Sequence, residues 1–416
     1  MEDIYYALNP WWEGKDFDCG IPREEYLNKF NAGFDRRQIE IILGGRRVGK
    51  TTFVKQLVKQ CLKKNLPARN ILYLAIDHPR FLGVSLTEHL TFFRKLFMHG
   101  RNEKLFLFLD EIQESPNWEG ELKAIYDLEN VKIISSGSTL SLIQSQGGKL
   151  TGRQIVTTIY PLSFKEFLSF KKESLSLAES YKYENLVEDY LNTGGYPENV
   201  LNPSDEYLCS LLEDILARDL IRVFRPKKSD IFKDLLRLMA SSVGSRISFN
   251  KLSNILGVSV DTVKEYVAHL QTAFLVKSME KWSSSHKERI YTAKKIYFLD
   301  TGFQSLLTGR LNLGAKAENT VFLHFLRKGK YCGYFAESEK EIDFVGGTYE
   351  YPAGTEVKYM SEFEWQDKRF AGVRLFLRRF PSTKEVTIIS KNVERELEES
   401  GIKIIVIPLW KFLLRE

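Results

Sequence analysis

The chain contains little cysteine. Four cysteines occur in 416 residues, and they lie far apart, at Cys19, Cys61, Cys209 and Cys332. Structural zinc sites and the disulfide frameworks of secreted domains use closely spaced cysteines. The spacing therefore argues against both, and it is typical of a protein in a reducing cytosol.

Long apolar runs and low-complexity tracts are also missing. No run approaches the ~18 apolar residues that a membrane span requires. The N-terminus begins Met-Glu-Asp and lacks the basic start and apolar core of a signal peptide. With 43% hydrophobic and 27% charged residues, the composition is that of a folded globular protein. We therefore expect a soluble cytoplasmic protein without a membrane partner.

The excess of one charge sign is small. The 60 basic and 54 acidic side chains give a formal net charge of +6, which permits a nucleic-acid partner without requiring one. Basic residues gather at 222–233, 287–295 and 368–379, and each group is equally well explained as a solvated face. A chain of this length is expected to form two to four domains.

The first part of the chain alternates short apolar runs with amphipathic stretches. The runs are IEIILGG, NILYLAID, KLFLFLDE, VKIISSGS and QIVTTIYPLS. Apolar strands separated by helices are typical of a parallel sheet covered on both faces. We predict an α/β domain with such a sheet over residues 1–163.

The rest of the chain predicts three further segments. Residues 164–226 read as helices interrupted by the turn NTGGYP, and we expect a helical lid. Residues 227–290 predict three helices with Gly257 in the middle turn, the pattern of a helix-turn-helix with a strand wing behind it. Residues 291–416 contain six candidate strands and predict a separate α/β domain.

The loop after the first predicted strand matches the phosphate-binding pattern G-x-x-x-x-G-K-[ST]. It comprises Gly44, Gly45, Arg46, Arg47, Val48, Gly49, Lys50, Thr51 and Thr52. Its glycines let backbone N–H groups wrap a β-phosphate, Lys50 reaches the β and γ oxygens, and the Thr51 hydroxyl ligates Mg²⁺. The strand before it and the helix after it make a chance match improbable, so we predict binding of ATP and Mg²⁺.

An acidic pair follows the third apolar strand. Asp110 is expected to hold the water shell of Mg²⁺, and Glu111 to polarise the attacking water as the general base. The alternative is that both merely favour a helix N-terminus. Ser136 ends the next strand, where its hydroxyl either bonds the γ-phosphate or the water, or only serves a turn.

These segments resemble the AAA+ superfamily, and more closely a prokaryotic ATPase family, common in archaea, with a trailing uncharacterised region. The resemblance covers nearly the whole chain and is carried by GGRRVGKTT, LFLFLDEIQ with Trp118 after it, ISSGSTLSLI, LTGR, PLSFKEF, GGYPE, EN, EIDFV and EVK. It implies an ATP hydrolase that forms a homo-oligomer, with Ser136 as the sensor of the fourth strand.

The resemblance also implies roles for two residues outside the phosphate loop. Arg153 of LTGR stands where an arginine finger is expected before the fifth strand, and the alternative is a structural arginine that caps a helix. Pro197 of GGYPE is similar to a proline that packs near the adenine. The alternative there is that Gly194 and Gly195 only end a helix.

A second set of charged residues lies in the last segment. Glu318, Asp343, Glu356 and Lys358 resemble the site of the PD-(D/E)xK nucleases, which implies a restriction-endonuclease-like domain over 291–416. Carboxylates there bind Mg²⁺ beside a phosphodiester, while a lysine orients the water. Asp343 lacks the preceding proline of the family pattern, and short acidic motifs also occur on ordinary solvated strands.

The helix-turn-helix offers few side chains for reading DNA. The candidate base-reading side chains on its second helix are Lys264, His269 and Gln271. If DNA is bound, we therefore expect the phosphate contacts to come largely from the wing, through Arg289, Lys294 and Lys295. Contact with a protein is an equal alternative for this segment.

Two main interpretations of function follow. The first is an ATP-driven enzyme that processes DNA, with nuclease activity possible in the last segment. The second is a regulatory, nucleotide-switched scaffold without nuclease activity that binds protein partners or DNA. A third is that ATP is a structural ligand that locks the lid.

Overall fold

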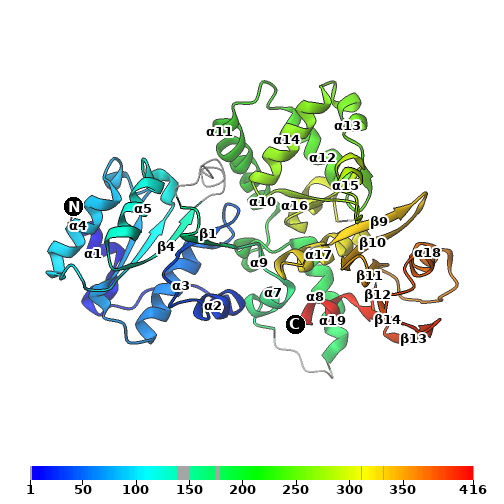
Figure 1. The fold of residues 1–416 in the computed structure, drawn as a ribbon, viewed down its shortest axis with the longest axis horizontal. Coiled ribbons are helices and arrows are strands. Elements are labelled where there is room, and N and C mark those ends of the chain that lie inside the picture. Colours follow the sequence, from blue (N-terminus) through cyan, green and yellow to red (C-terminus); the bar gives the residue numbers. More distant parts are fainter. Residues whose placement is uncertain (1, 138–149, 174–178, 311, 331, 416) are drawn as a thin grey trace. The chain divides into compact units, whose positions relative to one another are not determined.

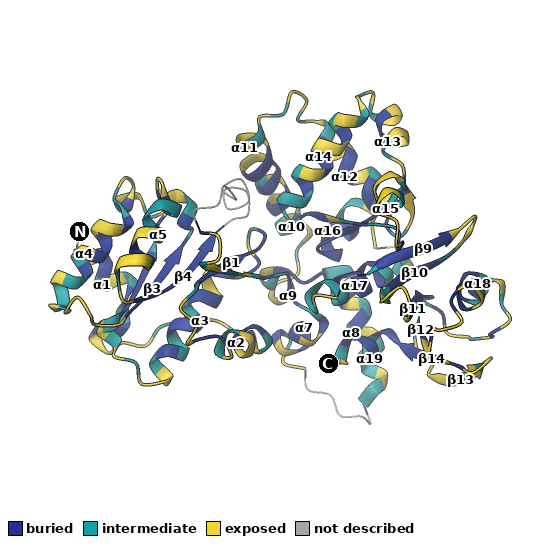
Figure 2. Cartoon of the chain, in the orientation of Figure 1, coloured by how far each residue is buried: buried dark blue, intermediate teal, exposed yellow. Residues whose placement is uncertain are grey.

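A computed structural model describes residues 2–137, 150–173, 179–310, 312–330 and 332–415. The chain divides into two compact units, Met1–Ile159 (unit 1) and Tyr160–Glu416 (unit 2). The strands within each unit are largely buried, as Figure 2 shows. No helix in the described ranges is both long enough and apolar enough to cross a membrane.

Unit 1 is built on a five-stranded sheet in which all neighbouring strands are parallel. In spatial order the strands are β2 (Ile71–Ala75), β3 (Leu105–Asp110), β4 (Val131–Gly137), β1 (Ile39–Leu43) and β5 (Gln154–Thr158). β1, β3 and β4 are buried along their whole length, which explains why they read as continuous apolar runs. The predicted parallel sheet is confirmed.

Helices lie on both sides of this sheet (Figure 1). The α-helices in the described part of unit 1 are α1 (Glu2–Leu8), α2 (Glu24–Asn31), α3 (Lys50–Lys63), α4 (Leu86–Phe97) and α5 (Trp118–Leu128). α3 packs on β3 and β4, whereas α5 contacts β4 from the other side together with α4. Right-handed connections between parallel strands require helices on both faces here. The connection from β1 to β2 runs in one direction along the sheet, and those from β2 to β3 and from β3 to β4 run in the other.

Unit 2 begins with a run of helices. They are α7 (Phe164–Phe170), α8 (Ser180–Thr193), α9 (Pro197–Leu201), α10 (Asp205–Asp214), a π-helical turn at Ile215–Ile221 and α11 (Arg222–Phe224). α16 (Thr301–Thr308) packs against α8, α10 and α12 (Ile231–Ser241). The helices predicted as a lid are therefore packed within unit 2.

Three helices and a small antiparallel sheet form the middle of unit 2. The helices are α12, α13 (Phe249–Leu256) and α14 (Val260–Thr272), and the sheet has the order β6 (Arg246–Ile247), β8 (Lys294–Phe298), β7 (Val276–Met279). α15 (His286–Tyr291) lies between β7 and β8 in the sequence. Gly257 ends α13 at φ 63°. Assignment of this segment as a winged helix stays a prediction.

The last part of unit 2 is a six-stranded mixed sheet. In spatial order its strands are β13 (Arg395–Glu399), β14 (Ile402–Pro408), β12 (Glu385–Ser390), β11 (Pro352–Val357), β10 (Lys340–Gly347) and β9 (Gly333–Glu337). β9, β10 and β11 are antiparallel, whereas β11, β12 and β14 are parallel. The accompanying helices are α17 (Leu313–Arg327), α18 (Ala371–Arg379) and α19 (Leu409–Leu414).

The Gly194–Gly195 turn holds α8 against two other parts of unit 2. Gly194 follows α8 at φ 76°. Gly195 N–H donates to the Asp300 carboxylate at 2.6 Å, and Gly195 O accepts from Leu162 N–H at 2.6 Å. A Cβ on Gly195 would overlap the Leu162 carbonyl, and a Cβ on Gly194 would overlap Asp300. Both glycines are thus required by close backbone packing.

We expect Gly195→Ala to lower the free energy of unfolding by roughly 1–3 kcal/mol, because the new methyl group overlaps backbone atoms that cannot move aside. Urea unfolding of the variant measures this loss. Gly314→Ala is the control, since its Cβ would meet only Asn312 Oδ1 at 3.9 Å. Equal stability of the two variants would contradict the close approach at Gly195.

Candidate functional site

The loop between β1 and α3 has a conformation that depends on glycine at both ends. A Cβ on Gly44 would overlap the carbonyl of Ile159, and Gly49 adopts φ 94° as the residue before α3. Glycine adopts this backbone conformation at no steric cost. The loop therefore leads directly into the N-terminus of α3, where backbone N–H groups favour an anion.

Lys50 and Thr51 stand at the first turn of α3. The buried Lys50 ammonium donates to the carbonyl oxygens of Gly44 at 3.2 Å and Gly45 at 3.0 Å, so it lies folded over the loop. Thr51 and Thr52 are exposed. The Lys50 ammonium at the loop and the accessible Thr51 hydroxyl beside it fit a nucleoside triphosphate with Mg²⁺. Lys50 would hold the phosphates and Thr51 the metal ion.

Asp110 ends β3 at the same edge of the sheet as the phosphate loop. Its carboxylate is buried and accepts two hydrogen bonds, from Ser136 Oγ on Oδ1 and from Tyr73 OH on Oδ2 at 3.1 Å. Ser136 lies on β4 and Tyr73 on β2, the strands on either side of β3. The two hydroxyls therefore fix the orientation of the Asp110 carboxylate at this edge of the sheet.

Tyr73 was not found from the sequence. It occurs within the apolar run NILYLAID, where a tyrosine reads as one more core residue. Burial raises the pKa of Tyr73, and the neighbouring Asp110 carboxylate raises it further. The phenol therefore stays protonated at neutral pH and can donate to Asp110. The role of Tyr73 follows from its hydrogen bond to Asp110 on the adjacent strand, and only the pairing of β2 with β3 reveals that the two residues are neighbours.

Glu111 has an unusual backbone. It adopts φ 53° and ψ 48°, a left-handed conformation that is uncommon for a residue with a Cβ. Such residues cost of order 1–3 kcal/mol and cluster at functional sites. The conformation turns the chain sharply after Asp110, and Gln113 Nε2 donates to the Glu111 carboxylate. Glu111 is only partly buried, as a base that polarises water requires.

A segment near the N-terminus is fastened to the phosphate loop. Gln56 Nε2 on α3 donates to the carbonyl oxygens of Cys19 at 2.9 Å and Ile21 at 2.8 Å, and Gln56 Oε1 accepts from Arg23 N–H. Arg23 Nη1 donates to the carbonyl of Val48 within the loop at 3.2 Å. Residues 19–23 are therefore held against α3 and the phosphate loop, and the sequence patterns did not indicate this contact.

Arg153 lies at the opposite edge of the sheet from the phosphate loop of its own chain. β5 is parallel to β1 with Gln154 opposite Ile39, so Arg153 precedes the start of both strands. At about 3.3 Å per residue, the five residues of β1 separate it from the loop by roughly 16 Å. Its guanidinium pairs with Asp127, with Nε–Oδ1 at 3.1 Å and Nη2–Oδ2 at 3.4 Å. A role in trans stays a prediction.

The position of Pro197 stays untested, and part of one motif lies outside the described residues. Pro197 is the first residue of α9 in unit 2, and its position near the adenine stays a prediction. In the segment ISSGSTLSLI, residues 138–143 lie outside the described residues.

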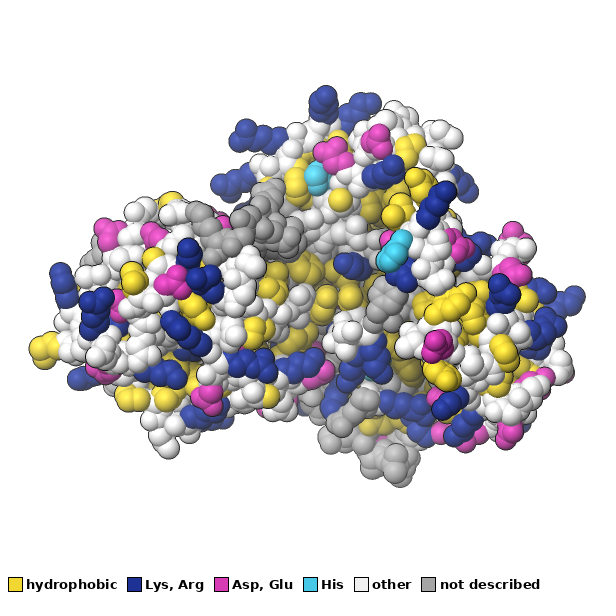
Figure 3. All heavy atoms as spheres, viewed as in Figure 1, with side chains coloured by type: hydrophobic (Ala, Val, Ile, Leu, Met, Phe, Trp, Pro, Cys, Tyr) yellow, Lys and Arg dark blue, Asp and Glu magenta, His cyan; other side chains and the backbone are white. Residues whose placement is uncertain are grey.

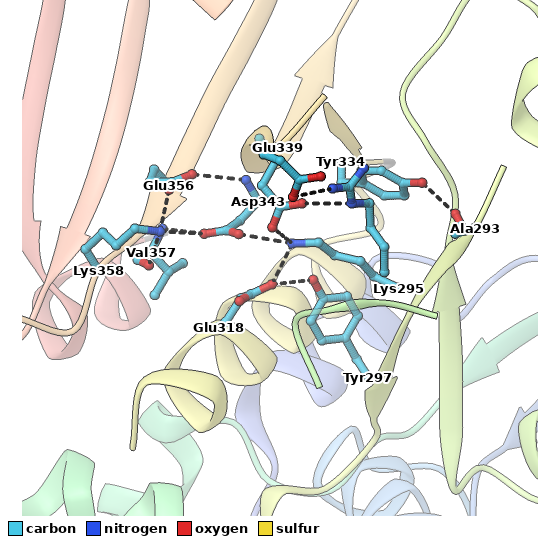
Figure 4. Close-up of polar contacts among 12 residues, drawn as sticks. Ala293, Lys295, Tyr297, Glu318, Tyr334, Glu339, Asp343, Glu356, Val357 and Lys358 are labelled. Carbon is cyan, nitrogen blue, oxygen red and sulfur yellow. Dashed lines mark hydrogen bonds and ion pairs between the residues drawn. The ribbon is translucent and has the colours of Figure 1, made fainter. Parts of the chain in front are cut away.

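In unit 2 the structure brings Glu318, Asp343, Glu356 and Lys358 together (Figure 4). Glu318 comes from α17, Asp343 from β10, and Glu356 and Lys358 from β11 and the residue after it. Asp343 N–H donates to Glu356 Oε2 at 3.1 Å, and Lys358 Nζ donates to Glu356 Oε1. Antiparallel pairing of β10 with β11 therefore brings Asp343 beside Glu356 and Lys358.

Lys295 lies in the middle of this set. Its side chain on β8 has no exposed surface, and its ammonium lies 3.1 Å from Glu318 Oε1, 3.1 Å from Asp343 Oδ1 and 3.3 Å from Glu341 Oε1. The expectation that Lys295 contacts DNA phosphates is therefore wrong. Sequence reasoning missed this role because two lysines before an apolar strand read as its solvated start.

The two lysines set the charge of the cluster. Burial lowers the pKa of Lys295. The surrounding carboxylates of Glu318, Asp343 and Glu341 have the larger opposite effect, so the pKa of Lys295 lies well above its ordinary value. Burial together with the Asp343 charge raises the pKa of Glu356 to about 8. Across the described residues, no group of three or more His, Cys, Asp or Glu is arranged to hold a metal ion.

The side chains expected to read DNA on α14 are engaged within unit 2. The His269 ring stacks on Phe224 with centroids 3.5 Å apart, and Gln271 Oε1 accepts from the backbone N–H of Ser278. Lys264 pairs with its neighbour Asp261 at 3.2 Å. This surface of α14 therefore presents little that could recognise base edges.

On the expected wing, Arg289 and Lys294 also have partners. Arg289 Nε donates to the carbonyl of Ser283 at 2.6 Å, and Lys294 Nζ pairs with Glu280 at 3.1 Å. A phosphate contact from either would compete with these bonds.

We expect Tyr73→Phe to lower the rate of Mg²⁺-dependent ATP hydrolysis about tenfold and to raise the Mg²⁺ concentration needed. The variant keeps the ring but loses a hydrogen bond to a carboxylate, which contributes about 1.5–3 kcal/mol. Steady-state phosphate release across a Mg²⁺ titration measures both effects. Tyr6→Phe is the control, because Tyr6 retains its ring contact with Trp12. Wild-type rates in Tyr73→Phe would show that Tyr73 does not position Asp110.

Comparison with known proteins agrees with the site in unit 1. Residues 36–168 match a family model described as "AAA domain", and residues 184–314 match one described as "Domain of unknown function (DUF8612)". An uncharacterized protein of Haemophilus influenzae is 28% identical over 402 residues, covering 94% of this chain and 98% of that protein. An uncharacterized protein of Methanocaldococcus jannaschii is 28% identical over 326 residues, covering 74% and 72%.

Among solved structures, the S. cerevisiae Hsp104-ADP complex is similar with 16% identity and a TM-score of 0.35, covering 64% of this chain and 40% of that chain. The C. elegans PCH-2 structure is similar with 17% identity and a TM-score of 0.25, covering 59% and 67%. The match to the AAA domain model, the parallel sheet and the phosphate loop together support nucleotide binding by residues 36–168.

Proposed function

We propose that the chain is a Mg²⁺-dependent ATP hydrolase that works as a nucleotide-switched regulatory scaffold without nuclease activity. The observation that carries the first part is the position of Asp110. It lies at the same sheet edge as the phosphate loop, held by Tyr73 and Ser136, and Glu111 follows it in a strained conformation. In this arrangement Asp110 is the group proposed for the metal ion, and Glu111 is the group proposed for the attacking water.

The proposed chemistry assigns one task to each side chain. With nucleotide bound, Lys50 would exchange its bonds to the loop carbonyls for the β and γ oxygens, and Thr51 and Asp110 would hold Mg²⁺. Bound Mg²⁺ would supply charge neutralisation between the phosphates. Glu111 orients and polarises the attacking water, and Ser136 keeps Asp110 turned toward the metal position.

Arg153 is proposed to act on the nucleotide of a second copy of the chain. At roughly 16 Å along the strand from its own loop it cannot reach its own γ-phosphate. An arginine supplied across a subunit boundary contributes ~10³ to 10⁵ in rate where it has been measured. The Asp127 ion pair would hold Arg153 in place until that boundary forms. Hydrolysis would then require a homo-oligomer.

The scaffold role rests on unit 2. Its candidate base-reading side chains on α14 are engaged internally. Lys and Arg side chains are scattered over the visible face of the chain rather than gathered in one area (Figure 3). These features favour binding of a protein partner, or of DNA through its backbone, over sequence-specific reading of DNA.

DNA cleavage is the second candidate. The observation that favours it is the order α17, β9, β10, β11, α18, β12 with Glu318, Asp343, Glu356 and Lys358 in one place, which resembles the nuclease arrangement expected from the sequence. Against it, Glu318 and Asp343 are ion-paired with Lys295, and Glu356 is paired with Lys358. A fold of this kind does not by itself provide the chemistry.

We expect mixing of two inactive variants to restore ATP hydrolysis. Lys50→Ala cannot bind phosphates but supplies Arg153, whereas Arg153→Ala supplies an intact phosphate loop. Phosphate release by the mixture should far exceed that of either variant alone, and wild-type turnover per chain should rise with protein concentration. Arg37→Ala is the control, because Arg37 also lies over the Tyr126 ring but is assigned no role in catalysis.

A mixture no more active than its components would remove the trans role of Arg153. Very slow turnover of the wild type at every concentration would instead favour ATP as a structural ligand.

We expect no cleavage of duplex, single-stranded or branched DNA by the wild-type chain in Mg²⁺ or Mn²⁺. Glu318 and Asp343, which would hold the metal ion, are already ion-paired with Lys295. Gel analysis of end-labelled DNA tests this. Cleavage that disappears in Asp343→Ala and persists in Lys50→Ala would establish the nuclease instead.

A further inference from the structure

The Lys295 ammonium lies in a pocket of carboxylate oxygens contributed by three side chains. Glu318 reaches it from α17, and Asp343 and Glu341 reach it from β10. Figure 4 shows Lys295 extending from β8 between Glu318 and Asp343. Tyr297, two residues further along β8, donates its hydroxyl to Glu318 Oε1 at 2.7 Å. The carboxylates thus surround a cation supplied by the chain itself.

The geometry around Lys295 fits an ammonium and not a metal ion. An ammonium has three N–H donors, and three carboxylate oxygens lie at 3.1, 3.1 and 3.3 Å from its nitrogen. Mg²⁺ requires oxygen ligands at about 2.0–2.1 Å, and Ca²⁺ at about 2.3–2.6 Å. Carboxylate oxygens are ligands that both metal ions prefer. Here their distances from the central position are those of N–H···O hydrogen bonds, which are longer than metal–oxygen bonds.

Charge repulsion would oppose a divalent cation in this cluster while Lys295 remains. A metal ion bound to Glu318 and Asp343 would lie within about 3–4 Å of the ammonium, where like charges repel strongly in a buried site. The ammonium cannot turn away into water, because its side chain is completely enclosed.

The small antiparallel sheet supplies a second cation to the same carboxylates. Arg246 on β6 is paired in register with Lys295 on β8, and its Nε lies 3.5 Å from Glu341 Oε2. Two adjacent cations of the β6-β8-β7 sheet therefore contact β10 of the six-stranded sheet. The contact joins the middle part of unit 2 to its last part.

We propose that Lys295 is a built-in cation that takes the place of a divalent metal ion among Glu318, Asp343 and Glu341, and that removing its charge converts the cluster into a metal site. In the wild-type chain the cluster then serves as an ionic tie between β8 and β10. The proposal concerns unit 2 alone and does not depend on ATP hydrolysis by unit 1.

Binding of Mn²⁺ to nucleotide-free protein tests the proposal. All chains carry Asp110→Asn, which silences the metal position expected in unit 1, and free Mn²⁺ is measured by electron paramagnetic resonance. With Lys295 present, no Mn²⁺ should bind in unit 2 up to roughly 1 mM. Lys295→Met should bind one Mn²⁺ at least about tenfold more tightly than that limit, and adding Asp343→Asn should abolish it.

Two control variants separate the charge of Lys295 from its packing. Lys295→Arg retains a cation and should bind no Mn²⁺. Lys294→Met removes the neighbouring lysine, which pairs with Glu280 outside the cluster, and should also bind none. Mn²⁺ binding in unit 2 while Lys295 is present, lost again with Asp343→Asn, would overturn the proposal.

Folding of the variant gives a second readout. If Lys295→Met is unfolded in metal-free buffer, circular dichroism should show refolding when Mn²⁺ is added, because the metal ion replaces the missing charge. A variant that stays unfolded in Mn²⁺, or that folds without binding it, would overturn the proposal.

Discussion

Parallel pairing of the central strands of unit 1 is the constraint on which its chemistry depends. Parallel strands end at the same edge of a sheet, so the phosphate loop after β1, Asp110 at the end of β3 and Ser136 near the end of β4 lie close together although they are distant in sequence. The same pairing places Arg153 at the other edge. One register therefore decides which groups lie beside the phosphate loop and which lie at the far edge of the sheet.

Buried charge is handled differently in the two units. Asp110 is buried and accepts hydrogen bonds from two neutral hydroxyls. Asp343 is buried to a similar extent but faces the ammonium groups of Lys295 and Lys358, which oppose the effect of burial and hold its pKa below the ordinary value. The two acidic sites look alike in the sequence and differ in what neutralises them.

The sequence predicted those features that follow from local pattern. The glycines and Lys50 of the phosphate loop, the apolar strands and the acidic pair each show in consecutive residues. Tyr73 and Lys295 could not be predicted, because their roles come from neighbours on other strands: Asp110 for the first, Glu318 and Asp343 for the second. A buried lysine is the harder case, since lysine is almost never fully enclosed without carboxylate partners.

The most direct test of ATP hydrolysis by unit 1 is a single-turnover measurement that compares wild type with Glu111→Gln. Both proteins are loaded with labelled ATP and Mg²⁺, and bound nucleotide and released phosphate are followed together. Wild type should bind ATP and release phosphate, whereas Glu111→Gln should bind equally well and release it at least about a hundredfold more slowly. Equal release by the two proteins, or failure of wild type to bind ATP, would contradict the proposed site.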